Sequence, residues 1–291
     1  MFEPDYRNIV NTARNKEAAR LPLYEHNVSM NKIKEYGYDV VTFEECIGAI
    51  MPGSGALEDS RVTPVIQDED DFKAYPWDEV PELYFKTYSR YFRALRDEMP
   101  EGMKAIGGVG NGVFECVQDL TGYQGLCYIS ADDEELYHQL FQKAGETNLK
   151  IWKRFMKEFG DVYCVLRFGD DLGYKSNTLL STDDTKNLIF PQYKPIVDLV
   201  HSYGKPFLLH SCGKIFDVMD DLIDKVGIDV DVVCNVSKQE MKEYIHDVIR
   251  KCTGHGGFAV GTGNSIPDYV PAENYLNMIE IVREYRGDYK K

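Results

Sequence analysis

The sequence predicts a single α/β domain over residues 1–291, folded as a barrel of parallel strands of the (β/α)8 type. Two observations predict this fold class. Short apolar or β-branched runs alternate with longer stretches of helical periodicity, which is the pattern of repeated βα units. The length of 291 residues is ordinary for one such barrel, and a hydrophobic fraction of 43% is enough for its core.

Seven short runs are expected to form the strands. Each is apolar or β-branched and is followed by glycine or polar residues, as in the buried strands of a parallel sheet. In chain order they are Leu21–Glu25, Asp39–Phe43, Ala105–Val109, Val162–Phe168, Pro206–His210, Ile228–Val233 and Gly257–Gly261.

Helices are expected between these strands, and three of them have recognisable first turns. A serine or aspartate there can accept the unpaired N–H groups of the turn. The three starts are Ser181–Asp184 ahead of Thr185–Tyr203, Asp132 and Asp133 ahead of Glu134–Phe159, and Ser237 ahead of Lys238–Cys252. The polar, proline-containing segment Pro64–Pro81 is expected to be a surface excursion that leads into a helix at Glu82–Met99.

Charge and composition exclude several classes of partner. The formal net charge of -15 would repel nucleic acid and anionic membrane surfaces. No run approaches the roughly 20 apolar residues that span a bilayer, and the first residues lack the pattern of a secretory signal. The seven cysteines form no CxxC pair and are interpreted as reduced thiols. We therefore expect a cytoplasmic protein that acts on a small molecule.

The loops after the strands carry the chemistry of such a barrel. Asp170 and Asp171 follow the predicted strand Val162–Phe168, and alternation along a strand predicts that only one of them faces the barrel mouth. A carboxylate there could take a proton, bind a metal or hold a cation. In the structural alternative, one aspartate caps the next helix and the other pairs with Arg167.

His210 and Cys212 follow the strand Pro206–His210 at a spacing that can place both side chains on one side. Imidazole and thiolate together suit zinc, which usually takes three protein ligands in a catalytic site. Cys234, Glu115 or an aspartate would have to supply the third ligand. The alternative is that both side chains only pack the rim of the barrel.

The glycine-rich segment Gly107–Gly112 lacks the Lys-Ser or Lys-Thr of a phosphate-binding loop, so its glycines are expected to leave room for a ligand. The sequence contains no GxSxG motif, so serine hydrolase chemistry has no support in it. The candidate catalytic residues are Asp170, Asp171, Glu115 and His210, the candidate substrate-binding residues are Asn111, Arg167, Lys175, Asn264, Glu25 and His26, and the candidate metal ligands are His210 and Cys212.

Four motifs in this order, GGVGNGVFE, LRFGDDLG, KPFLLHSCGKIFDVMDDLID and GTGNSIPDYVPAENY, resemble the uroporphyrinogen decarboxylase superfamily over nearly the whole chain. The resemblance implies a (β/α)8 barrel and one of two activities. One branch decarboxylates uroporphyrinogen without a cofactor in haem biosynthesis. The other branch contains methyltransferases that serve corrinoid proteins. Decarboxylase relatives often form dimers, so the resemblance also implies a possible homodimer.

The sequence departs from both branches of this superfamily. The arginine-rich RQAGRY motif of the decarboxylases is absent, and Asn264 stands where their late histidine is expected. In the methyltransferases, zinc bound by His-x-Cys and a later Cys activates a thiol. His210 and Cys212 match the first part, and Asn264 replaces the later Cys. The incomplete zinc triad argues against coenzyme M as the acceptor. We expect a methyltransferase-like member that serves a corrinoid protein and acts on methoxylated or methylated small compounds, with zinc as a further candidate cofactor. A uroporphyrinogen decarboxylase and a non-catalytic corrinoid- or tetrapyrrole-binding protein are the alternatives.

One βα unit of the family pattern is absent, because Asp224 is followed almost directly by the strand that begins at Ile228, and the stretch from His26 to Lys34 is also short. Seven strands would then stand in a fold that closes with eight. Either the unit is lost or the chain is interrupted near Val226–Ile228 or His26–Met30. We predict an interruption, with consecutive Cα atoms well over about 3.8 Å apart.

Overall fold

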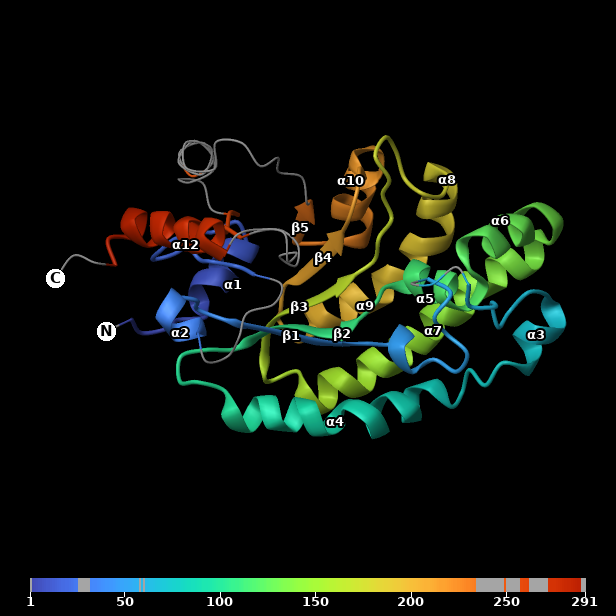
Figure 1. Cartoon of the computed structure of the whole chain (residues 1–291), viewed down its shortest axis with the longest axis horizontal. Helices are drawn as coiled ribbons and strands as arrows, with labels where there is room; N and C mark the ends of the chain where they lie inside the picture. Colours follow the sequence, from blue (N-terminus) through green and yellow to red (C-terminus); the bar gives the residue numbers. More distant parts are fainter. Residues whose placement is uncertain are drawn as a thin grey trace.

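The computed structural model describes residues 2–25, 32–57, 59, 61–233, 249, 257–261 and 272–288. Its helices and strands alternate along the chain, which is the order of an α/β protein (Figure 1). In chain order they are α1 (Arg7–Ala13), α2 (Ile33–Tyr36), β1 (Val41–Cys46), η1 (Gly48–Ile50), α3 (Glu69–Ala74), α4 (Val80–Glu98), β2 (Ala105–Gly110), α5 (Val113–Thr121), α6 (Tyr123–Asp132), α7 (Glu134–Phe159), β3 (Tyr163–Gly169), α8 (Thr182–Asp184), η2 (Thr185–Ile189), α9 (Phe190–Ser202), β4 (Phe207–Ser211), η3 (Phe216–Val218), α10 (Met219–Asp221), η4 (Leu222–Val226), β5 (Val230–Val233) and α12 (Ala272–Arg286).

Strands β1 to β5 form one parallel sheet in which each strand pairs with the next along the chain. Two further segments extend this order. Leu23 forms a parallel bridge with Val260, and Thr42 Oγ1 on β1 donates to the Glu25 carbonyl oxygen over 2.5 Å. The last predicted strand therefore lies beside the first, and the first lies beside β1, as in a barrel. The predicted α/β class with a parallel sheet is confirmed, and the described segments follow the strand order of a barrel.

Helix α1 closes the amino-terminal end of the strands. Ile9 and Ala13 on α1 pack in one buried cluster with Ile106 of β2 and Leu208 of β4. A larger cluster lies outside the strands, where α4, α5, α7 and α9 bury their apolar faces. Figure 1 shows α1, α2 and α12 at one end of the molecule and α3, α5, α6 and α8 at the other. The second end is where the loops after the strands gather.

The helix starts follow the sequence closely where they are described. Asp133 and Ser181 each accept a backbone N–H from the third following residue, from Leu136 over 3.0 Å and from Asp184 over 2.9 Å. The predicted helix from Ser237 falls outside the described residues. The excursion at Pro64–Pro81 contains the short helix α3, which was not predicted from its polar composition. This helix begins at Asp68, whose side chain caps it by accepting the Asp71 N–H.

The predicted interruption near Val226 is not found. Helix η4 ends at Gly227, which has a left-handed φ of 89°, and the N–H groups of Gly227 and Ile228 both donate to the Leu222 carbonyl oxygen. Glycine adopts this conformation without strain, so the chain turns at once into β5 beside β4. The other predicted interruption, at His26–Met30, lies outside the described residues.

Helix α12 ties late residues to the first strand segment. Arg286 donates through Nε to the Leu21 carbonyl oxygen and through Nη1 to the Gly37 carbonyl oxygen, and Arg283 donates to the Glu35 carbonyl oxygen over 2.8 Å. The Arg286 side chain is only 1% exposed and faces the buried Asp39 carboxylate. None of the helices in the described ranges is both long and apolar enough to cross a lipid bilayer.

Candidate active site

Three neighbouring strand ends bring the candidate residues together. The Gly112 N–H after β2 donates to the Gly169 carbonyl oxygen at the end of β3 over 2.7 Å. The Asp170 N–H after β3 donates in turn to the His210 carbonyl oxygen on β4 over 2.9 Å. These backbone bonds fix the three loops to one another, so polar side chains from distant parts of the sequence share one rim.

Asp170 is fully buried and caps helix α5 from the next strand. Its carboxylate accepts the N–H of Phe114 over 2.9 Å, the N–H of Glu115 over 2.7 Å and the O–H of Tyr193. These donors and the helix dipole stabilise the charged form. Burial is the larger effect and raises the pKa of Asp170 to about 7. Gly112 has no side chain because a Cβ there would lie 2.2 Å from Asp170 Oδ2.

Glu115 is the second acid of this cluster and holds its proton more tightly. Burial and the neighbouring Asp170 charge raise the pKa of Glu115 to about 8. Its oxygens accept an N–H of the Asn111 side chain over 2.7 Å and the Asp171 backbone N–H over 3.3 Å. The two acids titrate as a pair, and Glu115 is the one that keeps its proton to higher pH.

Protonated Glu115 makes stability depend on pH. Because its folded pKa of about 8 lies above the value of 4.5 for a free glutamate, its contribution is complete below pH 4.5 and is lost as pH rises through 8. Over this window the wild type should lose about 2–4 kcal/mol of unfolding free energy that the E115Q variant keeps. Urea denaturation of both proteins at pH 5.5 and 8.5 measures the difference, and parallel pH curves would contradict the assignment.

Asp171, His210 and Cys212 form a possible metal-binding cluster. One ligand atom of each lies within 4.8 Å of the others, and Cys212 Sγ lies 3.7 Å from His210 Nε2. Asp171 Oδ1 accepts the Cys212 backbone N–H over 2.9 Å, which fixes the carboxylate beside the thiol. One nitrogen, one sulfur and one oxygen donor match a catalytic zinc site with a fourth position open. Of the third ligands that the sequence offered, an aspartate, Asp171, is the one that lies beside His210 and Cys212.

Arg167 lies deeper in the barrel than these three residues. Its side chain is 1% exposed, and Nη1 lies 2.5 Å from Glu44 Oε2 on β1. The structural alternative of an Arg167 pair with Asp170 or Asp171 is therefore wrong: Asp170 caps α5, and Asp171 turns towards Cys212. Sequence reasoning missed Glu44 because the strand was expected to end at Phe43. Alternation of Thr42, Glu44 and Cys46 along a longer strand would have indicated it.

The remaining candidates lie apart from the cluster or outside the described residues. Lys175 is exposed on the loop after β3. Glu25 is buried, and its charge helps burial to raise the pKa of Tyr275 to about 12. His26 and Asn264 lie outside the described residues. Tyr193, which donates to Asp170, was missed because nothing in the sequence distinguishes it from the core tyrosines.

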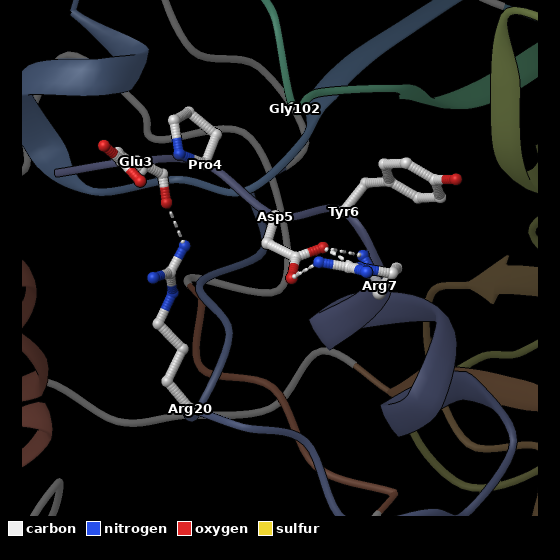
Figure 2. A pocket seen from close by; sticks show the side chains of 7 residues that line it. All are labelled: Glu3, Pro4, Asp5, Tyr6, Arg7, Arg20 and Gly102. Carbon is white, nitrogen blue, oxygen red and sulfur yellow. Dashed lines mark hydrogen bonds and ion pairs between the residues drawn. The ribbon is translucent and has the colours of Figure 1, made fainter.

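A separate cavity of about 450 Å³ lies at the amino-terminal end, lined by Glu3, Pro4, Asp5, Tyr6, Arg7, Arg20 and Gly102 (Figure 2). Its cations are already paired. Arg7 donates to both Asp5 carboxylate oxygens over 2.7 Å, and Arg20 donates to the Glu3 carbonyl oxygen and forms an ion pair with Asp39. Active sites of this barrel type lie at the opposite end, so this cavity is no candidate for the reaction site.

Comparison with known proteins agrees with the fold. The family model described as uroporphyrinogen decarboxylase (URO-D) matches residues 2–235. Among solved structures, a methyltransferase from Methanosarcina mazei is similar, with a TM-score of 0.68 and 13% sequence identity over 97% of this chain and 99% of that one. No curated protein sequence matches. Because the family model covers most of the sequence, the chain belongs to the uroporphyrinogen decarboxylase family.

Proposed function

We propose that the protein is a methyltransferase-type member of this family that moves a methyl group between a corrinoid cofactor on a partner protein and a small thiol. The convergence of Asp171, His210 and Cys212 carries this proposal. The family's methyltransferases need three zinc ligands, and a third donor is present although position 264 is an asparagine. Asp171 takes the place of the later cysteine in this proposal.

Zinc held by Asp171, His210 and Cys212 would lower the pKa of a bound thiol and so supply a thiolate at neutral pH. The chain's own residues prepare the ligands. The Cys212 N–H orients Asp171, and the Leu172 N–H donates to the buried Ser211 hydroxyl over 3.0 Å, which fixes the loop against β4. Protonated Glu115 limits the negative charge around Asp171.

The arginines near the amino terminus support the methyltransferase over the decarboxylase. A substrate with eight carboxylates needs a basic pocket at the active-site mouth. Arg7 and Arg20 are instead engaged at the opposite end with Asp5 and Asp39, and Arg14 donates to the Gly204 carbonyl oxygen there. The rim that carries Glu115, Asp170 and Asp171 is acidic.

The test is an assay of methyl transfer from free methylcobalamin to a panel of small thiols. The absorbance change of the corrinoid measures the reaction. Zinc-loaded wild-type protein should demethylate methylcobalamin, and the C212S variant should lose at least about 100-fold in rate. The C127S variant, which removes an exposed thiol on α6, should match the wild type. Conversion of uroporphyrinogen by a protein inactive towards methylcobalamin would establish the decarboxylase instead.

A further inference from the structure

Arg167 and Glu44 form an ion pair across an intervening strand. Glu44 lies on β1 and Arg167 on β3, and β2 runs between them. Glu44 pairs in register with Gly108, and its neighbour Gly107 has a φ of +126°. A Cβ at Gly107 would lie 2.3 Å from the Phe43 carbonyl oxygen and 3.3 Å from Glu44 Cβ. A side chain at Gly107 would therefore meet the β1 backbone beside Glu44.

Glu44 satisfies only part of the Arg167 guanidinium. Arginine offers five N–H donors in a planar fork, and within the described part of the chain Arg167 Nε has no hydrogen-bond partner although it is buried. A buried donor without a partner is costly, and it is often a position that a ligand completes. The planar fork matches a carboxylate, which can accept two parallel N–H bonds.

Arg167 lies next to the metal-binding cluster. A Cβ built on Gly169, at the end of β3, would lie 3.5 Å from His210 Cδ2 and 3.9 Å from Arg167 Nη2. Both side chains therefore flank the same glycine, and no side chain of residue 169 separates them. A small molecule that reaches the guanidinium with one end would place its other end beside His210.

The acidic residues around Arg167 determine which charge on a bound ligand is favourable. Glu44 lies against the guanidinium, and Asp170 and Asp171 follow the end of the strand that carries Arg167. A singly charged carboxylate suits this field better than a phosphate dianion, because like charges repel strongly in a partly buried site.

We propose that Arg167 is the specificity-determining residue for the small substrate and binds its carboxylate, while Glu44 fixes the guanidinium in the barrel. The substrate is then a short carboxylic acid whose reacting end lies beside Asp171, His210 and Cys212. The assignment of that reacting end rests on the proposed function; the carboxylate site itself does not.

Calorimetric titration with two- to five-carbon monocarboxylates, acetamide and inorganic phosphate tests this site in metal-free and zinc-loaded protein. We expect a monocarboxylate to bind, acetamide and phosphate not to bind, and R167Q to weaken the affinity at least about 10-fold. E44Q should tighten binding, because it keeps an acceptor for Arg167 and removes the competing charge. K153Q removes an exposed cation of helix α7, away from the site, and should bind like the wild type.

G169A is a second test of the carboxylate site, which changes no charge and keeps the proposal testable if R167Q does not fold. In G169A the new methyl group would make only ordinary contacts with His210 and Arg167, so the melting temperature should stay within a few degrees. Because the methyl group would lie between these two side chains, the affinity for the carboxylate should fall. Equal binding by wild type and R167Q, or weaker binding by E44Q, would overturn the proposal. Carboxylate binding without methyl transfer would contradict the proposed function alone, and methyl transfer without carboxylate binding would contradict this site alone.

Discussion

The H210A variant is expected to lose its zinc. His210 supplies the one nitrogen donor of the cluster formed with Asp171 and Cys212, and two remaining ligands do not hold a zinc ion against dialysis. Its zinc affinity should fall by more than about 100-fold, since the loss of an outer-shell partner alone costs about 10- to 100-fold. Metal analysis after dialysis and competition with a chelator of known affinity measure the change.

The D171N variant tests the substituted ligand itself. Asparagine keeps the size of the side chain and an acceptor for the Cys212 N–H, but it removes the charge that the metal requires. Its zinc affinity should therefore fall nearly as far as in H210A. The control is H138A, which removes an exposed histidine on α7 and should retain one equivalent of zinc. Unchanged affinity in D171N would exclude Asp171 from the ligand set.

The G112A variant is expected to be the most destabilised single-methyl change in the site. The added Cβ would lie 2.2–2.4 Å from the atoms of the Asp170 carboxylate, which is fully buried and bonded to the α5 N-terminus. Asp170 would have to leave its donors, so overpacking and lost charged hydrogen bonds combine. We expect a loss of about 2–4 kcal/mol of unfolding free energy, measured by urea denaturation.

G125A is the matched control for G112A. Gly125 lies in helix α6, and a Cβ there would have no neighbour within 4 Å. Alanine should stabilise this helix by up to about 1 kcal/mol because it restricts the unfolded chain. Equal effects of the two substitutions would show that Asp170 does not need the space left by Gly112.

The sequence predicted the strands well because each is buried on both faces and has a continuous apolar core. All seven predicted positions coincide with a paired strand or with the Leu23–Val260 bridge. Boundaries were less accurate where polar residues continue a strand. Strand β1 runs to Cys46 and not to Phe43, because Glu44 is neutralised by Arg167 inside the barrel. A single sequence does not reveal such a partner 123 positions away.

The candidate site was predicted in composition but not in its internal contacts. The carboxyl ends of parallel strands meet at one rim, so Asp170, Asp171 and His210 were expected to converge. Which aspartate faces the metal ligands depends on backbone bonds between neighbouring loops, such as Asp170 N–H to the His210 carbonyl oxygen. These bonds are made by main-chain atoms and leave no signature in the residue types.

The attachment of helix α12 to the first strand segment has a consequence for biosynthesis. Arg286 bonds to carbonyl oxygens 265 and 249 positions earlier in the chain. The ribosome must therefore synthesise nearly the whole polypeptide before α12 can bind the first strand segment. Contacts between residues so far apart in sequence form slowly. Until then the edge next to Leu23 is open to pairing with other nascent chains, so chaperone demand should be greatest at the final stage of synthesis.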